Sequence, residues 1–431
     1  MKKVLVITYY WPPSGGAGVQ RWLKLTKYLP QFGWEPVVLT VRPEDATYPV
    51  TDHTLEADIS GETRVIKTRS REVYSVYQRL YKPDQIPNAG FASGDADSFM
   101  QKLARFIRGN FFIPDPRKGW NKAAFQAAKR LIREENIDCI ITSSPPHSTQ
   151  LIGHKLSRRF SIPWVADLRD PWTGIYYYRQ LYPTFLAHQV NLRLERKVLK
   201  DADQIITVGP SLKEHFQHKG RVKREKIQVV TNGFDEADFS DLPGPGRKEF
   251  LCTYVGTLSD QYPIDAVVSA IKELTGPAPP IKFRLVGSVS EKQRKKLESL
   301  PANTFEFIPQ VDHHAAIRYM AESHLLLLIT PEHSSGKSIL TGKLFEYLAT
   351  GNHILGIGPV DGDASAVLKE TKSGIMLDPG DNHGIKKAIQ SALEKYKTGQ
   401  PTRRPGNDHM KYSRENLTRT YAEVLNRITE Q

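Results

Sequence analysis

Residues 341–358 read TGKLFEYLATGNHILGIG and predict a short helix followed by a buried strand. Thr341 is placed to cap the first turn of that helix, and Gly351 to take the left-handed conformation just past its end. Because a helix N-terminus presents unpaired N–H groups and partial positive charge, the start of the helix, with Lys343, suits a phosphate or diphosphate. Glu346, one turn further in, is able to accept hydrogen bonds from sugar hydroxyls. The stretch therefore suits a nucleotide-sugar, but an ordinary amphipathic helix has the same pattern, so the rest of the chain must decide.

The alternation of helix and strand extends over most of the chain. Two runs have helical periodicity, GVQRWLKLTKYLPQF (18–32) and WNKAAFQAAKRLIREEN (120–136). Short apolar runs that predict strands are KVLVIT (3–8), PVVLTV (36–41), CIITSS (139–144), WVADL (164–168), QIITV (204–208), IQVVT (227–231), FLCTYVG (250–256), IKFRLVG (281–287), TFEFI (304–308), HLLLLIT (324–330) and HILGIG (353–358). Such strands, alternating with helices, predict an α/β fold of parallel sheets with helices on both faces.

Two stretches rich in Pro, Gly and charge divide this pattern. They are DLPGPGRKE (241–249) and KTGQPTRRPGND (397–408), and the second precedes a final helical segment. We predict an N-terminal Rossmann-like domain over residues 1–243, a second over 244–405 and a C-terminal helix over 406–431. Open parallel sheets bind ligands beyond the carboxyl ends of their strands, so we expect a ligand cleft between the two domains.

Composition limits the class of protein. The chain has 431 residues, 39% hydrophobic and 25% charged, which is typical of a globular protein with room for two cores. No window approaches the roughly 20 apolar residues that a membrane-spanning helix needs. Cys139 and Cys252 lie in strand-like runs and predict buried free thiols in a reducing, cytoplasmic compartment. The net charge of +13 favours anionic partners, and without a recognisable nucleic-acid module these are phosphorylated small molecules or an acidic membrane surface.

Two glycine-bearing loops resemble nucleotide-binding fingerprints but depart from them. In PPSGGAGVQR (12–21), glycines 15, 16 and 18 allow close approach to a diphosphate, yet Arg21 replaces the third glycine of the NAD fingerprint. In SSGKS (334–338), Pro331 replaces the first glycine of a Walker A loop. The sequence therefore favours neither a dehydrogenase nor a P-loop NTPase.

The motif Asp361-Gly362-Asp363 has the Asp-x-Asp form that can hold a divalent metal. It lies just before a predicted helix, where Asp363 serves equally well as an N-cap. We favour the capping role and predict no metal site.

Polar residues follow two neighbouring strands of the first half. His147 belongs to SSPPHS (143–148), at the end of one strand, and Asp167, Arg169 and Asp170 belong to ADLRDPW (166–172). They offer hydrogen-bond acceptors and a fixed positive fork near one edge of the sheet. Two structural alternatives stay open, since a lone histidine is often structural and the two aspartates suit a clamp on Arg169.

Residues 43–118 interrupt the alternation, and 99–118 combine aromatic with basic side chains. A helix here suits packing within the domain. The alternative is a surface that meets lipid headgroups or a lipid-linked acceptor.

Seven motifs occur in an order that resembles a family 4 glycosyltransferase of the bacterial type that builds capsule, O-antigen or exopolysaccharide. They are GGAGVQR, SPPHS, ADLRDPW, TNGFD (231–235), YVGTLS (254–259), FRLVGS (283–288) and KLFEYLATG. The resemblance implies a GT-B fold of two facing Rossmann-like domains, with the last helix crossing back to the first. It also implies retaining transfer from a nucleotide-diphospho-sugar, without cofactor or metal, to a glycan or lipid-linked acceptor. We therefore expect a cytoplasmic enzyme of surface polysaccharide synthesis. Separately, the net charge of +13 and the aromatic and basic residues of 99–118 predict peripheral binding at the inner face of the cytoplasmic membrane.

The resemblance carries over residue by residue, with two departures. Glu346 matches the second glutamate of the family's E-x7-E motif, but Ser338 stands in place of the first, which usually meets the donor hexose. Gly256 matches the glycine before the phosphates, but the Arg and Lys that normally follow are missing. Lys337 and Lys343 are therefore our candidates to offset the charge of the leaving diphosphate.

Our assignments divide into three sets. For catalysis we expect His147, Asp170, Lys343 and Glu346. The donor-binding candidates are Gly16, Gly256, Thr257, Lys337, Ser338, Thr341, Lys343 and Glu346, and the acceptor-binding candidates are Gly18, Gln20, Asp167 and Arg169. Two alternatives remain, a nucleotide-sugar 2-epimerase of similar fold and a degenerate binding protein that no longer transfers sugar.

Overall fold

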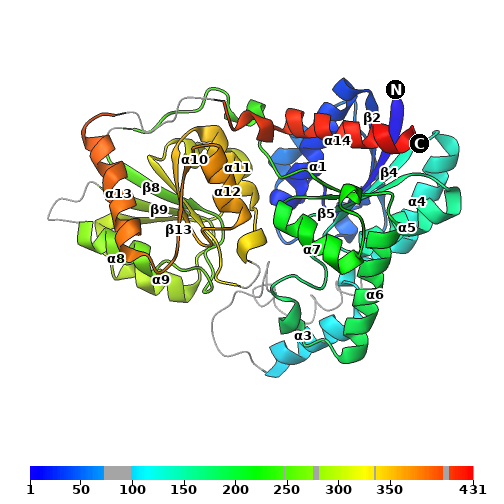
Figure 1. Cartoon of the computed structure of the whole chain (residues 1–431), viewed down its shortest axis with the longest axis horizontal. Helices are drawn as coiled ribbons and strands as arrows, with labels where there is room; N and C mark the ends of the chain where they lie inside the picture. The colour runs from blue at the N-terminus through cyan, green and yellow to red at the C-terminus, as the bar shows by residue number, and fades with distance from the viewer. Residues whose placement is uncertain (72–98, 247, 275–280, 334–335, 401–406, 431) are drawn as a thin grey trace. The chain divides into compact units, whose positions relative to one another are not determined.

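The computed structural model describes residues 1–71, 99–246, 248–274, 281–333, 336–400 and 407–430. They form two compact units, shown in Figure 1. The first contains the described residues of 1–231 together with 414–430, and the second those of 232–413. The predicted domain limits and the expected cleft between the domains stay predictions.

A seven-stranded parallel sheet forms the centre of the first unit, in the order β3-β2-β1-β4-β5-β6-β7. Its strands are β1 (Lys2–Ile7), β2 (Trp34–Val41), β3 (Arg64–Thr68), β4 (Cys139–Ser144), β5 (Trp164–Leu168), β6 (Gln204–Thr207) and β7 (Ile227–Val229). The central strands are buried throughout, which explains their nearly continuous apolar sequence. The sequence pattern missed β3, an edge strand whose polar residues leave it partly exposed.

Helices cover both faces of this sheet. The helices of this unit are α1 (Ala17–Tyr28), α3 (Phe99–Phe111), α4 (Asn121–Glu134), α5 (Ser148–Phe160), α6 (Phe185–Asp201), α7 (Pro210–Gly220) and α14 (Arg414–Thr429). Helix α14, the red helix of Figure 1, lies along α1 within this unit. The Trp22 and Tyr421 rings meet edge to face at 5.3 Å, and Trp34 Nε1 donates to Asn426 Oδ1 at 3.0 Å. The final helix therefore returns to the first sheet, as predicted.

The second unit repeats the design with a six-stranded parallel sheet, in the order β10-β9-β8-β11-β12-β13. Its strands are β8 (Phe250–Val255), β9 (Ile281–Val286), β10 (Phe305–Ile308), β11 (Leu325–Ile329), β12 (His353–Ile357) and β13 (Gly374–Leu377). Its helices are α8 (Asp265–Leu274), α9 (Glu291–Glu298), α10 (His313–Ala321), α11 (Gly342–Thr350), α12 (Asp363–Glu370) and α13 (Asn382–Lys397). The predicted α/β fold of the GT-B class is confirmed.

Two further expectations are met. Cys139 and Cys252 are free and buried, and burial raises the pKa of both thiols. Among the helices of the described ranges, none is both long enough and apolar enough to cross a membrane.

Candidate functional site

The carboxyl end of β8 forms one candidate site, in the second unit. Gly256, directly after the strand, has a φ of 123°, a conformation that favours glycine. A Cβ on Gly256 would lie 2.6 Å from Nζ of Lys343 on α11. The loop after β8 and the first turn of α11 are therefore in contact, and a side chain at 256 would push the lysine away.

Lys343 is held by aromatic and hydroxyl groups. Its Nζ donates to the Tyr254 hydroxyl at 3.0 Å and lies 4.3 Å from the centre of the Tyr254 ring. The hydroxyl of Tyr254 in turn donates to the carbonyl of Thr257 at 2.8 Å. Burial lowers the pKa of Lys343 to about 8, and the charge of Glu346 only partly opposes this shift. A partly desolvated cation beside a glycine loop is suited to an anionic ligand.

The N-terminus of α11 differs from the prediction in one detail. Thr341 occupies the N-cap position, but its side chain makes no capping hydrogen bond, and its buried Oγ1 has no partner among the described residues. The predicted side-chain cap is therefore wrong. At the other end, Gly351 has a φ of 73° and ends the helix in the left-handed conformation, as predicted.

Glu346 lies one turn further along α11, next to a residue that sequence reasoning missed. Its Oε1 is 3.0 Å from Nε2 of His313, at the start of α10. Both side chains keep some exposure, 19% for Glu346 and 14% for His313. The histidine fixes one carboxylate oxygen, and nothing in the sequence pattern indicated the contact because 33 residues separate the two.

The loop before α11 contains the other predicted cation. Lys337, in the short 3-10 helix η10 (Gly336–Ser338), forms an exposed ion pair with Asp361. This hydrogen bond lowers the pKa of Asp361. Gly362, not Asp363, is the N-cap of α12, so the predicted cap is displaced by one residue. The part of the chain that the structure describes contains no cluster of three potential metal ligands.

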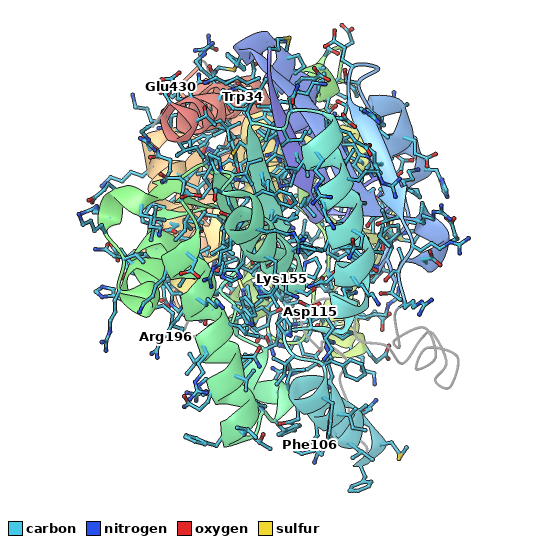
Figure 2. The ribbon with its side chains drawn as sticks, turned by 90° about the vertical axis from the view of Figure 1, so that its right-hand side faces the viewer. Trp34, Phe106, Asp115, Lys155, Arg196 and Glu430 are labelled. Atoms are coloured by element: carbon cyan, nitrogen blue, oxygen red, sulfur yellow. The ribbon has the colours of Figure 1, made fainter. Side chains whose placement is uncertain are left out.

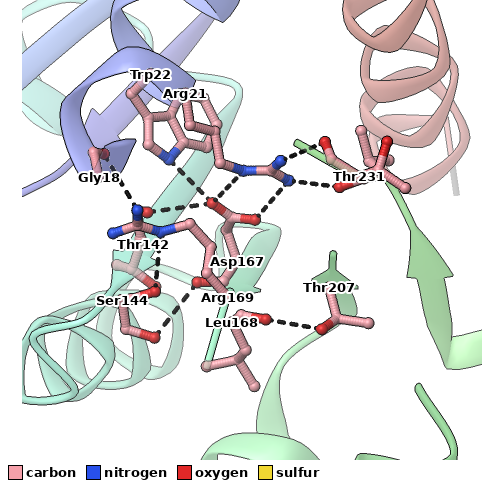
Figure 3. Close-up of polar contacts among 12 residues, drawn as sticks. Gly18, Arg21, Trp22, Thr142, Ser144, Asp167, Leu168, Arg169, Thr207 and Thr231 are labelled. Carbon is pink, nitrogen blue, oxygen red and sulfur yellow. Dashed lines mark hydrogen bonds and ion pairs between the residues drawn. The ribbon is translucent and has the colours of Figure 1, made fainter. Parts of the chain in front are cut away.

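In the first unit, Asp167 at the end of β5 is fully buried (Figure 3). Its carboxylate accepts from Arg21 Nε and Nη2 at 3.1 and 2.9 Å. Trp22 Nε1 and Ser143 Oγ donate to the same carboxylate at 3.0 and 3.1 Å. Arg21 also donates to the carbonyls of Val230 and Thr231. These contacts give Asp167 a structural role and leave no exposed oxygen for an acceptor in this structure.

Arg169 is clamped by carbonyls instead of by the aspartates. Its guanidinium donates to the carbonyl oxygens of Ser144, Pro145 and Gly18, each at 3.2 Å. Figure 3 shows the contacts to Ser144 and Gly18. Arg169 thus joins the loops after β4 and β5 to the start of α1, where Gln20 is also buried.

Beside this clamp, the first unit contains a cavity of about 570 Å³. Its lining is rich in aromatic rings, with two arginines, His147 and Asp170 among the polar groups. The lining includes Tyr10, Arg108, Arg117, His147, Asp170 and Trp172. The structure thus brings the two predicted catalytic residues of this half together in one cavity, without Gly18, Gln20, Asp167 or Arg169 in its lining.

Burial shifts the pKa values of both His147 and Asp170 in the direction that favours their neutral forms. The His147 ring stacks on Trp172, with centroids 5.0 Å apart and planes 9° apart. Burial, and secondarily Arg169, lowers the pKa of His147 to about 3, so the imidazole is neutral at neutral pH. Its buried Nδ1 has no partner among the described residues. Burial raises the pKa of Asp170, while Arg169 opposes the shift.

The glycine-rich turn belongs to this first unit. Gly16 has a φ of 89° and is the N-cap of α1, while a Cβ on Gly18 would lie 3.2 Å from Nη1 of Arg169. The turn therefore needs glycine for its own geometry. The proposed roles of Gly16 towards a donor and of Gly18 and Gln20 towards an acceptor stay predictions.

Two protein-family models together match most of the chain. The model described as "Glycosyltransferase Family 4" matches residues 89–238, and the one described as "Glycosyl transferases group 1" matches residues 236–406. A search of curated protein sequences found no match.

Solved structures share the fold over the whole chain at low sequence identity. A sucrose-phosphate synthase from Thermosynechococcus elongatus has a TM-score of 0.59 and 16% identity, covering 100% of this chain and 97% of that one. Alr3699/HepE from Anabaena, in complex with UDP and glucose, has a TM-score of 0.62 and 15% identity, with coverage of 99% and 100%. WaaG, a glycosyltransferase involved in lipopolysaccharide biosynthesis, has a TM-score of 0.53 and 13% identity, with coverage of 99% and 97%.

Proposed function

We propose that this chain, which belongs to glycosyltransferase family 4, is a retaining enzyme that moves a sugar from a nucleotide-diphospho-sugar to a glycan or lipid-linked glycan. The observation that carries the proposal is the contact of Lys343 with the loop at Gly256, at the N-terminus of α11. This contact brings a cation, the N–H groups of a helix N-terminus and a glycine together at the end of one strand.

In this proposal the diphosphate lies between the Gly256 loop and the first turn of α11. Lys343 and the helix N-terminus stabilise the charge that develops as the sugar–phosphate bond breaks, so positive charge comes from the protein rather than from a metal. Glu346, oriented by His313, accepts hydrogen bonds from the ribose hydroxyls. A structural relative, Alr3699/HepE, was solved in complex with UDP and glucose, which supports a donor of this class.

Transfer with retention follows a front-face displacement in this proposal. The acceptor hydroxyl attacks the anomeric carbon from the side that the diphosphate leaves, and the leaving phosphate oxygen takes the hydroxyl proton. The acceptor-binding site is the aromatic cavity of the first unit, where His147 accepts or donates a hydrogen bond in its neutral form. Asp170 orients a sugar hydroxyl there.

We also propose that the acceptor is an intermediate of surface polysaccharide synthesis on the cytoplasmic side of the membrane. The aromatic lining of the cavity fits the apolar C–H faces of a sugar ring, and Arg108 and Arg117 fit a phosphate or a carboxylate on the same acceptor. Two buried free cysteines agree with a reducing compartment.

Calorimetric titration with a panel of nucleotide-sugars, followed by analysis of products with and without acceptor, tests the function. We expect one donor to bind and to be consumed only with acceptor, giving a product whose anomeric configuration matches the donor. Consumption without acceptor would identify an epimerase instead, and no binding by any donor would identify a degenerate binding protein. A Lys343→Ala/Glu346→Ala double variant that kept normal transfer would refute the site.

A further inference from the structure

Helices α3 and α6 form a projecting tip on the first unit whose surface is apolar. Among the described residues there are eleven exposed large hydrophobic side chains, and eight of them lie here. They are Phe99, Met100, Leu103, Phe106, Phe111, Tyr182, Phe185 and Leu186, which we call the apolar tip. Figure 2 shows α3 and the start of α6 together at one extremity of that view, with Phe106 labelled. Apolar clusters of this kind mark interaction surfaces.

The two helices of the apolar tip are held in a defined position by hydrogen bonds and close packing. The side chain of Asn110 donates to the carbonyl of Tyr182 at 3.0 Å and accepts from the backbone N–H of Thr184 at 2.7 Å. A Cβ on Gly109 would lie 2.3 Å from the carbonyl oxygen of Leu181, so only glycine allows this close approach. The most exposed members, Phe99, Phe185 and Leu186, are 78%, 80% and 74% exposed.

The two described segments that contain the apolar tip carry basic and no acidic residues. Residues 99–111 and 174–194 contain no acidic residue. Further along α6 the exposed charged residues before Asp201 are all basic, namely Arg193, Arg196, Lys197 and Lys200. The one acid among them, Glu195, is buried, where its carboxylate accepts from the Thr173 hydroxyl. An apolar surface at the start of a helix that carries these exposed basic residues complements an anionic bilayer interface.

We propose that the apolar tip inserts into the headgroup region of an anionic bilayer, while the basic residues of α6 contact the lipid phosphates. A second copy of the chain would present the same positive charge and so fits this surface less well. The C-terminal part of α3 also lines the aromatic cavity through Arg108 and Gly109. When the chain is docked in this way, the helix that meets the membrane also lines the cavity. This arrangement suits a lipid-linked acceptor. This last point rests on the proposed function, whereas membrane binding does not.

Vesicle flotation of the full chain without substrates tests the proposal. We expect binding to phosphatidylcholine vesicles with about 30% phosphatidylglycerol at low salt, weakening in about 1 M salt as the charges are screened. Binding to pure phosphatidylcholine should be at least about tenfold weaker. No binding to the anionic vesicles at low salt would overturn the proposal, and sugar transfer that persisted would show that the proposed function stands without it.

Matched variants locate the surface. Phe99→Ser/Phe185→Ser/Leu186→Ser should reduce partition by at least about tenfold, because three apolar side chains no longer enter the interface. Val360→Ser/Ile375→Ser, which removes exposed apolar residues of the second unit, should leave it unchanged.

A second pair of variants tests the basic residues of α6. Arg196→Gln/Lys197→Gln should weaken binding at low salt only, whereas Lys292→Gln/Lys295→Gln on α9 should have no effect. Equal effects of the paired variants would overturn the assigned surface. Concentration-dependent dimerisation that the triple serine variant abolishes, together with unchanged vesicle binding, would assign the tip to a second copy and overturn the proposal.

Discussion

The two units have sheets of closely similar strand order but very different loops at the carboxyl ends of their strands. In the second unit, β8 and β9 are followed by Gly256 and Gly287, both with positive φ, so no side chain stands directly after either strand. In the first unit, Tyr10 follows β1 and Trp172 follows β5, and bulky side chains surround a cavity. One sheet edge suits the close approach of a phosphate, and the other suits a ring-shaped or partly apolar group.

The units also differ in how they use positive charge. In the first unit, Arg21 forms an ion pair with a buried carboxylate, and Arg169 donates hydrogen bonds to backbone carbonyls. Among the described residues, Lys343 in the second unit contacts a neutral hydroxyl and an aromatic face. In the proposed function, Arg21 and Arg169 therefore stabilise the fold, whereas Lys343 meets the anionic donor.

The largest effect that we expect is on stability. Arg21→Leu should lower the free energy of unfolding by about 3–5 kcal/mol, because it leaves the buried carboxylate of Asp167 without its partner. Urea unfolding of the whole chain measures this loss. Lys3→Met, which removes a partly exposed pair with Glu35, should cost at most about 1 kcal/mol. Unchanged stability with weaker acceptor binding would restore Asp167 as an acceptor contact.

The next effect is on catalysis. Lys343→Met should lower kcat/KM for the donor by about 10²–10³-fold, because it removes the cation that meets the developing phosphate charge. Lys337→Met is the matched control, and its effect should stay below about tenfold because that lysine is already paired with Asp361. Equal losses in the two variants would mean that both lysines bind the diphosphate.

The sequence predicts those strands and site residues that have a local sequence pattern, and it misses those that depend on tertiary contacts. Buried parallel strands leave continuous apolar runs, so the central strands were predictable, while the short edge strands β3 and β13 are partly exposed and were missed. The positions of Lys343, Glu346 and Gly256 follow from local pattern and family resemblance. Their partners Tyr254 and His313 do not, since such contacts join residues 89 and 33 positions apart and depend on tertiary packing.

The aromatic cavity should respond separately from the donor site. His147→Ala should lower kcat/KM for the acceptor by about 10–100-fold, the range for losing a hydrogen bond and its support on Trp172. Donor affinity, measured by calorimetry, should stay the same. His53→Ala replaces an exposed histidine of the same unit and serves as control. A loss of donor affinity in His147→Ala would break the division between the two units.

The loop at Gly256 offers a smaller steric test. Gly256→Ala should weaken donor binding by about tenfold, since its Cβ collides with Lys343 Nζ. Gly351→Ala also places a side chain at a residue with positive φ, but at a site with nothing within 4 Å of the new Cβ. It should cost about 1 kcal/mol of stability and leave donor affinity unchanged. Equal donor affinities in the two variants would exclude a steric role for the contact.

The smallest effect concerns pH and contrasts the two titratable residues. Lys343 has a pKa of about 8 in the free protein, so it is charged below that pH and loses its proton above it. We expect kcat/KM for the donor to fall about tenfold per pH unit above about 8. In the complex the diphosphate favours the charged lysine, so the fall in kcat should begin at higher pH. Lys343→Arg should remove the alkaline fall, because a guanidinium stays charged throughout.

His147 should add no inflection on the acid side of the same profile. Its pKa of about 3 keeps the imidazole neutral from pH 5 upward, whereas an ordinary histidine would titrate near 6.5. An acid limb near 6.5 that vanished in His147→Asn would mean that the ring is charged and solvated rather than stacked in a dry cavity. The contrast between a neutral histidine in the aromatic cavity and a cationic lysine at the glycine loop would then fail for the histidine, while the alkaline limb would still test Lys343 independently.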